Sequence, residues 1–277
     1  MNNAFAEAQA RLSANYYLAP SDVSVGQFMQ WAREAGAKGI GLTVAALAAH
    51  SARDLKAMAD DNGLFISTLN SAGYFLFSAI DQRYVQEKLN NHLIESAAKM
   101  GAGRLVVITG GISGFGLTLE GARAHVAQSL AELDKRAGDA GIRLALEPIH
   151  PVDLTIKGCV NSVAQALAML KSLPNTDMAV DLFHSYWDDD IWRLRDIAGE
   201  RAAVVQVCNW SEPDPDAKPV RDVPSAGPMD VKRWLREVVA GGYTGPIEFE
   251  MFDRHRRGRP VPDILNQAFD ELRAILS

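Results

Sequence analysis

Short apolar segments alternate with longer amphipathic ones along the whole chain. The apolar segments, such as GRLVVITG and AAVVQVC, contain few polar residues. This composition is typical of parallel strands that are buried on both faces. Segments of this kind span residues 13–18, 38–44, 64–70, 103–110, 142–148, 178–184, 202–208 and 246–252. The pattern therefore predicts eight strands.

The segments between these strands have helical periodicity and carry residues that begin and end helices. Ser51 and either Ser21 or Asp22 are candidate N-caps, and Gly36 and Gly101 follow predicted helix ends. The predicted helices span 22–36, 51–61, 81–100, 118–140, 161–172, about 188–198, 230–240 and 261–276. Eight strand–helix units without a long linker predict an α/β fold, a single (β/α)8 TIM barrel over residues 1–277. A doubly wound open sheet fits this regularity less well.

Four successive predicted strands each carry an oxygen-bearing side chain near their end. These residues are Glu147, Asp181, Gln206 and Glu250. Alternate residues of a strand face opposite sides, and the faces opposite these four carry large apolar residues that suit packing against outer helices. We therefore expect the four side chains to point into the barrel at its C-terminal mouth, where the active sites of such barrels lie. Glu248 shares a face with Glu250, and we expect it to pair with an interior cation such as Arg143.

Carboxylates buried in an apolar setting are costly unless a cation accompanies them. A divalent metal ion at the point where the strands converge would remove this cost. Because all four donors are oxygens, Mn2+ is favoured, with Mg2+ or Co2+ as alternatives. Such a metal binds a carbonyl and a neighbouring hydroxyl. Glu147 and Glu250 are then the candidate catalytic residues, moving a proton at the carbon next to the carbonyl.

Composition and charge narrow the possible partners. The net charge is −6, which gives no reason to expect nucleic acid or an anionic membrane surface as a partner. The five basic residues between 254 and 259 are expected to serve a loop or a subunit contact. The two cysteines, Cys159 and Cys208, have no CxxC spacing, so we expect a reducing, cytoplasmic location. We expect neither a signal peptide nor a membrane span.

The segments EPIHP, DLFHSYWDDD, VVQVCNW and GYTGPIEFEMF resemble the sugar phosphate isomerase/epimerase superfamily. These xylose-isomerase-like barrels include ketose 3-epimerases, inosose dehydratases, 3-dehydroshikimate dehydratases and C-glycoside deglycosidases. The resemblance implies that Glu147, Asp181 and Glu250 are metal ligands. Gln206 stands where the family usually has histidine. A glutamine at this position resembles the dehydratase branch of the family. His184, three residues after Asp181, matches a substrate-contacting histidine of the family.

Further substrate-binding candidates follow the same strands: His150, Lys157, Trp187 and Trp210. Each has a simpler alternative. His150 would cap a loop, Lys157 would be solvated at the surface, and the two tryptophans would close a subunit interface.

These observations predict a divalent-metal-dependent isomerase or epimerase that transfers a proton alpha to the metal-bound carbonyl of a keto-sugar. A lyase of the 3-dehydroshikimate or inosose dehydratase type, or a C-glycoside deglycosidase of 3-keto sugars, is the alternative. A non-catalytic sugar-binding barrel is a third. An endonuclease of the related abasic-site group would need more metal-ligand histidines and a basic groove, of which this acidic chain gives no clear sign. The resemblance also implies a homo-oligomer, either a dimer or a tetramer.

Overall fold

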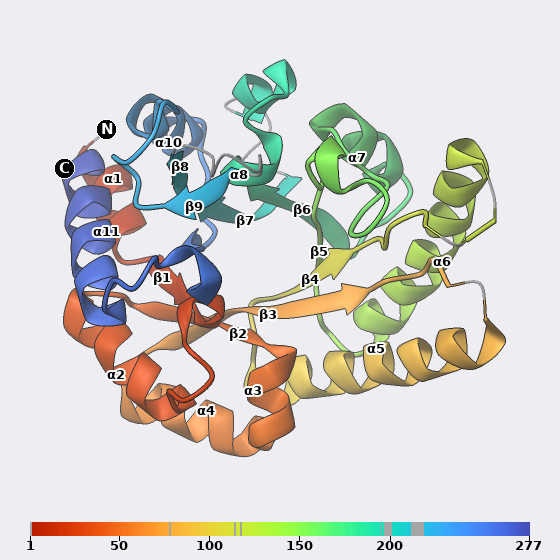
Figure 1. The fold of residues 1–277 in the computed structure, drawn as a ribbon, viewed down its shortest axis with the longest axis horizontal. Helices are drawn as coiled ribbons and strands as arrows, with labels where there is room; N and C mark the ends of the chain where they lie inside the picture. The colour runs from red at the N-terminus through yellow and green to blue at the C-terminus, as the bar shows by residue number, and fades with distance from the viewer. Residues whose placement is uncertain are drawn as a thin grey trace.

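Eight parallel strands close into a barrel in the computed structural model of the protein, and helices surround it (Figure 1). The structure describes residues 2–77, 79–113, 115–116, 118–194, 196, 201–211 and 219–277. The barrel strands are β1 (Leu12–Asn15), β2 (Gly39–Thr43), β3 (Phe65–Gly73), β4 (Arg104–Ile108), β5 (Leu144–Leu146), β6 (Thr176–Asp181), β7 (Ala202–Val207) and β10 (Ile247–Phe249). Each strand pairs with its neighbours in chain order, and β10 closes the ring onto β1. The predicted (β/α)8 barrel is confirmed.

The outer layer consists mainly of helices that connect successive strands. They are α1 (Asn2–Gln9), α2 (Val25–Ala35), α3 (Val44–Ala49), α4 (Ala52–Asp61), α5 (Ile80–Met100), α6 (Leu119–Asp139), α7 (Val163–Leu170), α8 (Leu182–Ser185), α10 (Val231–Ala240) and α11 (Val261–Ile275). The described residues also form the 3-10 turns η1 (Tyr16–Leu18), η2 (Pro151–Asp153), η3 (Asp189–Arg193) and η4 (Asp253–His255). The two ends of the chain lie close together beside α1 and α11 (Figure 1).

The N-cap residues of the helices confirm one prediction from the sequence and correct another. Ser51 caps α4 by accepting a hydrogen bond from the backbone of Asp54, as predicted. The predicted cap of α2 was wrong, because Ser24, and not Ser21 or Asp22, accepts the N–H of Gln27. The short helices α1 and α3 were not predicted.

The predicted strand over 178–184 ends early. The Asp181 carboxylate accepts the backbone N–H of Phe183 at 2.8 Å, which caps the short helix α8. His184 therefore lies on a helical turn and not on the strand. The predicted helix at about 188–198 begins as η3, and its residues 195, 197 and 198 lie outside the described residues.

A small hairpin was also missed. β8 (Asn209–Ser211) and β9 (Val220–Asp222) pair in antiparallel fashion beyond the end of β7. Asn209 anchors the start of the hairpin, since its side-chain amide donates to three carbonyls of the segment that leads to α10. The hairpin folds back over the mouth of the barrel and carries a residue into it, as described below.

Two apolar clusters agree with the predicted parity in β5 and β6, whereas around β7 the adjacent residues Ala203 and Val204 share one cluster and Cys208 belongs to the other. A small cluster inside the barrel contains Val106, Ala145, Ala179, Ala203 and Val204. The large cluster between strands and helices contains the residues of opposite parity, including Leu144, Leu146, Val180, Val205 and Phe249. Small apolar residues occupy the inside of the barrel, and the polar side chains lie beyond them, toward the carboxyl ends of the strands.

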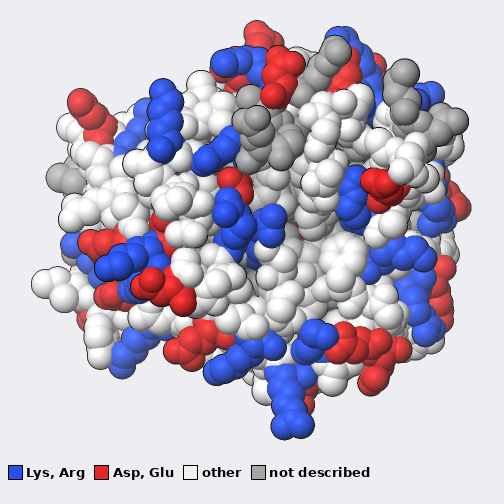
Figure 2. Space-filling view, turned by 180° about the vertical axis from the view of Figure 1, so that it is seen from behind, with Lys and Arg blue, Asp and Glu red and all other residues white. Residues whose placement is uncertain are grey.

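The surface carries both signs of charge. Lysine and arginine are interspersed with aspartate and glutamate over the face in Figure 2, so this face presents no continuous basic groove. No helix in the described part of the chain has the length and apolar character needed to cross a bilayer.

Candidate active site

Four strand ends bring the predicted metal ligands together at one end of the barrel. Asp181 on β6 lies opposite Gln206 on β7, and Gln206 lies opposite Glu248 on β10. Glu147 and Glu250 follow β5 and β10, and each continues the strand ladder through its backbone N–H, which donates to Val107 and Val207 respectively. Glu147, Asp181, Gln206 and Glu250 are each at most 3% exposed. One buried polar cluster therefore contains all four.

Direct contacts link the members of this cluster. The side-chain amide of Gln206 donates a short hydrogen bond to Glu250. Nε2 of His184 lies 3.7 Å from Oε1 of Glu147. One ligand atom each from Glu147, Asp181 and His184 fall within 4.8 Å of one another, a grouping that suits a metal ion.

Arg221 is the residue of this site that the sequence did not reveal. It lies on β9, is fully buried, and donates a short hydrogen bond to Asp181. Its guanidinium also lies 3.3 Å from Oε1 of Glu250 and stacks over the rings of Phe183 and Phe252 at 4.5 and 5.0 Å. The only hint in the sequence is one arginine between the apolar positions of VRDV, which is too weak a signal to use.

Glu248 lies deeper and has a structural environment. Its carboxylate accepts hydrogen bonds from Asn15 at 2.8 Å, Ser67 at 2.6 Å and Thr68 at 2.8 Å. The expected pairing with Arg143 was wrong, because Arg143 points outward and pairs with Asp177. Neutral donors thus satisfy Glu248, while Glu250 lines the open chamber above it.

Burial controls the ionisation of the two outer carboxylates. Burial raises the pKa of Glu147 to about 7, with Lys157 opposing the rise and Asp181 adding to it. Burial also raises the pKa of Glu250 well above its usual value, although Arg221 opposes this. The site contains four carboxylates. In the described part of the chain, Arg221 and Lys157 are the cations that act most directly on Glu147 and Glu250, and Arg254 lines the same chamber. A further positive charge or bound protons would balance the remaining negative charge.

His184 and Lys157 form the wall of the chamber beside Glu147. Nδ1 of His184 accepts the backbone N–H of His150 at 3.3 Å, so Nε2 faces the chamber, 2.8 Å from Nζ of Lys157. The pKa of His184 is lowered well below its usual value, first by burial and then by the charges of Lys157 and Arg221. The ring is therefore neutral at pH 7.

Three of the predicted substrate contacts lie outside this chamber. The His150 ring caps η2 by accepting the N–H of Val152, and it stacks on Tyr186. Trp187 is 42% exposed and donates its indole N–H to the carbonyl of His184. Trp210 lines a separate outer pocket with Trp192 and Trp234. Of the five candidates, the structure brings His184 and Lys157 to the site.

The chamber has a volume of about 470 Å³. Acidic, basic and aromatic side chains line it, including Glu147, Lys157, His184, Glu250 and Phe252. Asp181 and Gln206 lie below this lining. β5 and β10 are separated around the barrel by β6 and β7, so Glu147 and Glu250 reach the chamber from different sides.

The donor set fits a divalent metal ion. Oε1 of Glu147 and Oε1 of Gln206 are buried and have no hydrogen-bond partner within the described part of the chain. Buried polar atoms are rarely left unpaired, so such orphan oxygens suggest a missing partner such as an ion. Glu147, Asp181, Gln206 and Glu250 would hold this ion, and His184 is close enough to join them.

Known proteins resemble this chain in sequence and structure. The 3-dehydroshikimate dehydratase of Pseudomonas aeruginosa is 30% identical over 169 residues, which cover 56% of this chain and 24% of that protein. The fructoselysine 3-epimerase of Escherichia coli O157:H7 is 24% identical over 55% of this chain and 53% of that protein. The chain thus spans about a quarter and about half of these two relatives.

Among solved structures, protein SMc04130 from Sinorhizobium meliloti 1021 superimposes with a TM-score of 0.88 at 26% identity, covering 96% of this chain and 98% of that one. The family model described as xylose isomerase-like TIM barrel matches residues 29–275. A match of this extent, together with the closed barrel and the acidic cluster at its mouth, shows that the chain belongs to the xylose isomerase-like TIM barrel family.

Proposed function

We propose that this chain is a divalent-metal-dependent enzyme that moves a proton alpha to the carbonyl of a keto-sugar, with isomerisation or epimerisation as the result. The observation that carries this proposal is the placement of Glu147 and Glu250. Both line one chamber, they come from strands that are not neighbours, and the rest of the donor set lies between them. A base on one side of a bound carbon and an acid on the other are what an epimerisation requires.

The other residues of the chamber would bind and orient the substrate. Nε2 of His184 and Nζ of Lys157 meet at one point of the wall, where they would hold a hydroxyl or carbonyl oxygen of the sugar. Arg221 keeps positive charge beneath the chamber, where it would stabilise negative charge that develops on oxygen. When bound, a divalent ion, with Mn2+ as the first candidate and Mg2+ or Co2+ as alternatives, would polarise the carbonyl and lower the cost of removing the proton.

Deuterium wash-in from solvent tests this function. We expect protein loaded with Mn2+ to incorporate deuterium at a carbon next to the carbonyl of at least one keto-sugar in a panel. We expect Glu147→Gln to abolish this incorporation. Tight sugar binding without any deuterium exchange across the panel would contradict the proposed enzymatic function and favour a sugar-binding barrel.

Elimination is the second candidate, and Gln206 is the residue that favours it. Gln206 stands where the family usually has a histidine. A glutamine at this position resembles the dehydratase branch, and one of the relatives is a dehydratase. One of Glu147 and Glu250 would remove the alpha proton, and the other, in its protonated form, would donate a proton to the beta hydroxyl, which leaves as water. An unsaturated ketone would then form, and its near-ultraviolet absorbance would distinguish elimination from epimerisation. A C-glycoside of a 3-keto sugar would instead release its aglycone.

We also propose a homo-oligomer, a dimer or a tetramer, in a reducing compartment such as the cytoplasm. Ile80, Tyr84 and Val85 expose apolar side chains on the first turns of α5, with exposed fractions of 82%, 58% and 65%. Such a patch is typical of an interface. Both cysteines are buried and free, which suits a reducing environment. Sedimentation equilibrium tests the oligomeric state.

A further inference from the structure

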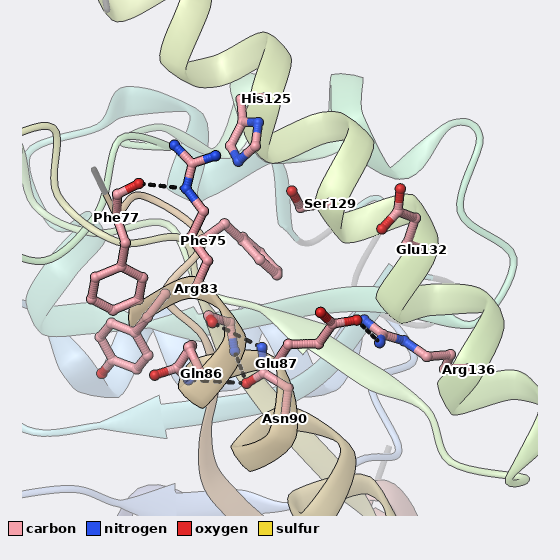
Figure 3. Close-up of a pocket in the computed structure, with 12 residues that line it drawn as sticks. Phe75, Phe77, Arg83, Gln86, Glu87, Asn90, His125, Ser129, Glu132 and Arg136 are labelled. Atoms are coloured by element: carbon pink, nitrogen blue, oxygen red, sulfur yellow. Dashed lines mark hydrogen bonds and ion pairs between the residues drawn. The ribbon is translucent and has the colours of Figure 1, made fainter. Parts of the chain in front are cut away.

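A small cavity lies between α5 and α6, apart from the chamber at the mouth of the barrel (Figure 3). Its volume is about 150 Å³, against about 470 Å³ for the chamber. Among the described residues, Tyr74 alone lines both spaces. Drug-sized ligands occupy pockets of about 300 Å³ or more, so this cavity suits a smaller molecule or an ion.

A stripe of polar side chains on each helix faces the cavity, as Figure 3 shows. The stripes consist of Arg83, Gln86, Glu87 and Asn90 on α5 and of His125, Ser129, Glu132 and Arg136 on α6. Spacings of three and four positions place them on one side of each helix. Helices usually bury apolar side chains where they pack together. Polar stripes that face each other across a cavity instead suit a polar ligand.

Two of these side chains have a structural role. The side-chain amide of Asn90 donates to the carbonyl of Gly73 at 3.0 Å and accepts the N–H of Gly73 at 3.0 Å. Gln86 donates to the same Asn90 oxygen at 3.1 Å, as the dashed lines in Figure 3 show. These bonds fix one wall of the cavity and leave ligand recognition to the other side chains.

Two arginines that line the cavity retain donors without partners. Nε of Arg136 is buried and has no hydrogen-bond partner in the described part of the chain, although another nitrogen of this guanidinium lies 3.0 Å from Glu87. Arg83 donates through Nε to the carbonyl of Phe77 at 2.6 Å, and no described carboxylate pairs with it. Buried polar atoms are rarely left unpaired, so the free donors point to an acceptor that carries negative charge.

Donors outnumber acceptors around the cavity. The hydroxyl of Ser129 and the ring nitrogens of His125 form no hydrogen bond with a described residue. Glu132 is the one lining carboxylate that has no ion-pair partner among the described residues. A ligand must therefore accept several hydrogen bonds and donate one. A tetrahedral oxyanion that keeps a proton meets both requirements, whereas the ammonium of a zwitterionic amino acid would need more acceptors.

We propose that the cavity between α5 and α6 binds inorganic phosphate. Arg83, Arg136 and Ser129 would donate to its oxygens, and its protonated oxygen would donate to Glu132. Phosphate keeps a proton at pH 7 and sulfate does not, so Glu132 would repel sulfate. The bound ion would join α5 to α6. This site is independent of the function proposed for the chamber, because none of the side chains that would hold phosphate lines the chamber.

Calorimetric titration of the full chain tests the proposal. Sodium phosphate and sodium sulfate are each titrated, at pH 7 and equal ionic strength, into protein dialysed free of unbound metal. We expect a dissociation constant below about 1 mM for phosphate and one at least about tenfold higher for sulfate. Arg83→Met should raise the constant for phosphate at least about tenfold, because it removes a charge-assisted donor. Ser129→Ala, a milder change, should raise it severalfold.

Three further variants show where and how the ion binds. Glu132→Gln should bring the constants for phosphate and sulfate close together, since a neutral amide does not repel sulfate. Lys99→Met removes an exposed charge at the other end of α5, and Lys157→Met removes one from the chamber. Neither lysine variant should change the affinity for phosphate.

Several results would overturn the proposal. One is the absence of phosphate binding up to about 10 mM. Another is an affinity that survives both Arg83→Met and Ser129→Ala. Equal affinities for phosphate and sulfate in the unmodified protein would rule out recognition of the proton. Loss of phosphate binding in Lys157→Met would place the ion in the chamber instead.

Discussion

Arg221 and Asp181 form an ion pair at the mouth of the barrel in which both side chains are 0% exposed. The same guanidinium reaches Glu250 on the neighbouring side. A cation of the protein itself thus contacts two of the four proposed metal ligands. A metal ion bound at this site would share Asp181 and Glu250 with Arg221, which links metal binding to the hairpin that carries the arginine.

Replacing Arg221 with methionine should destabilise the metal-free protein strongly. Asp181 and Glu250 would remain buried without their cation, and removing one partner of a buried pair typically costs about 3–5 kcal/mol. Urea unfolding in the presence of a chelator measures this loss. Arg233→Met is the matched control, because Arg233 pairs with Glu237 on the surface, where such pairs contribute about 0–1 kcal/mol. Equal losses in the two variants would contradict a structural role for the buried pair.

Glu147→Gln and Glu250→Gln should each reduce turnover by at least about 10²–10⁴-fold, the range expected for loss of a general acid or base. Each substitution keeps the shape of the side chain and removes its charge, so metal content should also fall in at least one variant. Steady-state kinetics and elemental analysis measure the two effects. Glu95→Gln, on the exposed face of α5, should change neither. Full activity in both chamber variants would refute the proposed chemistry.

Metal affinity should rise with pH up to about pH 7. In the metal-free protein burial raises the pKa of Glu147 to about 7, so this carboxyl holds a proton below that pH. A metal ion must displace the proton, so the association constant should increase about tenfold for each pH unit below 7 and level off above it. The pKa of Glu250 is also raised, which makes the slope steeper.

Titrations with Mn2+ between pH 5.5 and 8 measure this dependence. Glu147→Gln should lower the slope by about one proton while weakening binding. An affinity that does not change between pH 5.5 and 7 would show that neither carboxylate is a ligand.

Asn90→Ala should destabilise the protein far more than Asn91→Ala. Asn90 is buried, and its loss leaves the N–H and the carbonyl of Gly73 without the partners they have now, at a cost of about 1–3 kcal/mol for each unsatisfied group. Asn91 is exposed on the same helix, so its truncation should cost little. Thermal unfolding compares the two.

Much of the site was predictable because its residues are tied to strand ends. Once Glu147, Asp181, Gln206 and Glu250 are assigned to strand ends that share one parity, closure of the barrel forces them to the same mouth. His184 was predicted from the resemblance to the family, which has a histidine three residues after this aspartate, although the strand ends at Asp181 and the histidine lies on α8. Trp187, on the turn after α8, and Trp210, on β8, do not line the chamber, because both lie beyond the barrel strands, where periodicity does not fix the direction of the chain.

The sequence by itself determined the strand–helix alternation, the parity of the strands and the gathering of acidic residues at one end of the barrel. These properties are local, since they depend on periods of two and 3.6 residues and on capping residues. Only the tertiary structure decided that Arg221 enters the site from a hairpin and that Asn90 fixes the backbone of Gly73. The Asn90–Gly73 and Arg221–Asp181 contacts join residues 17 and 40 positions apart in the chain. Packing and hydrogen bonding between segments bring these residues together, and no local pattern records them.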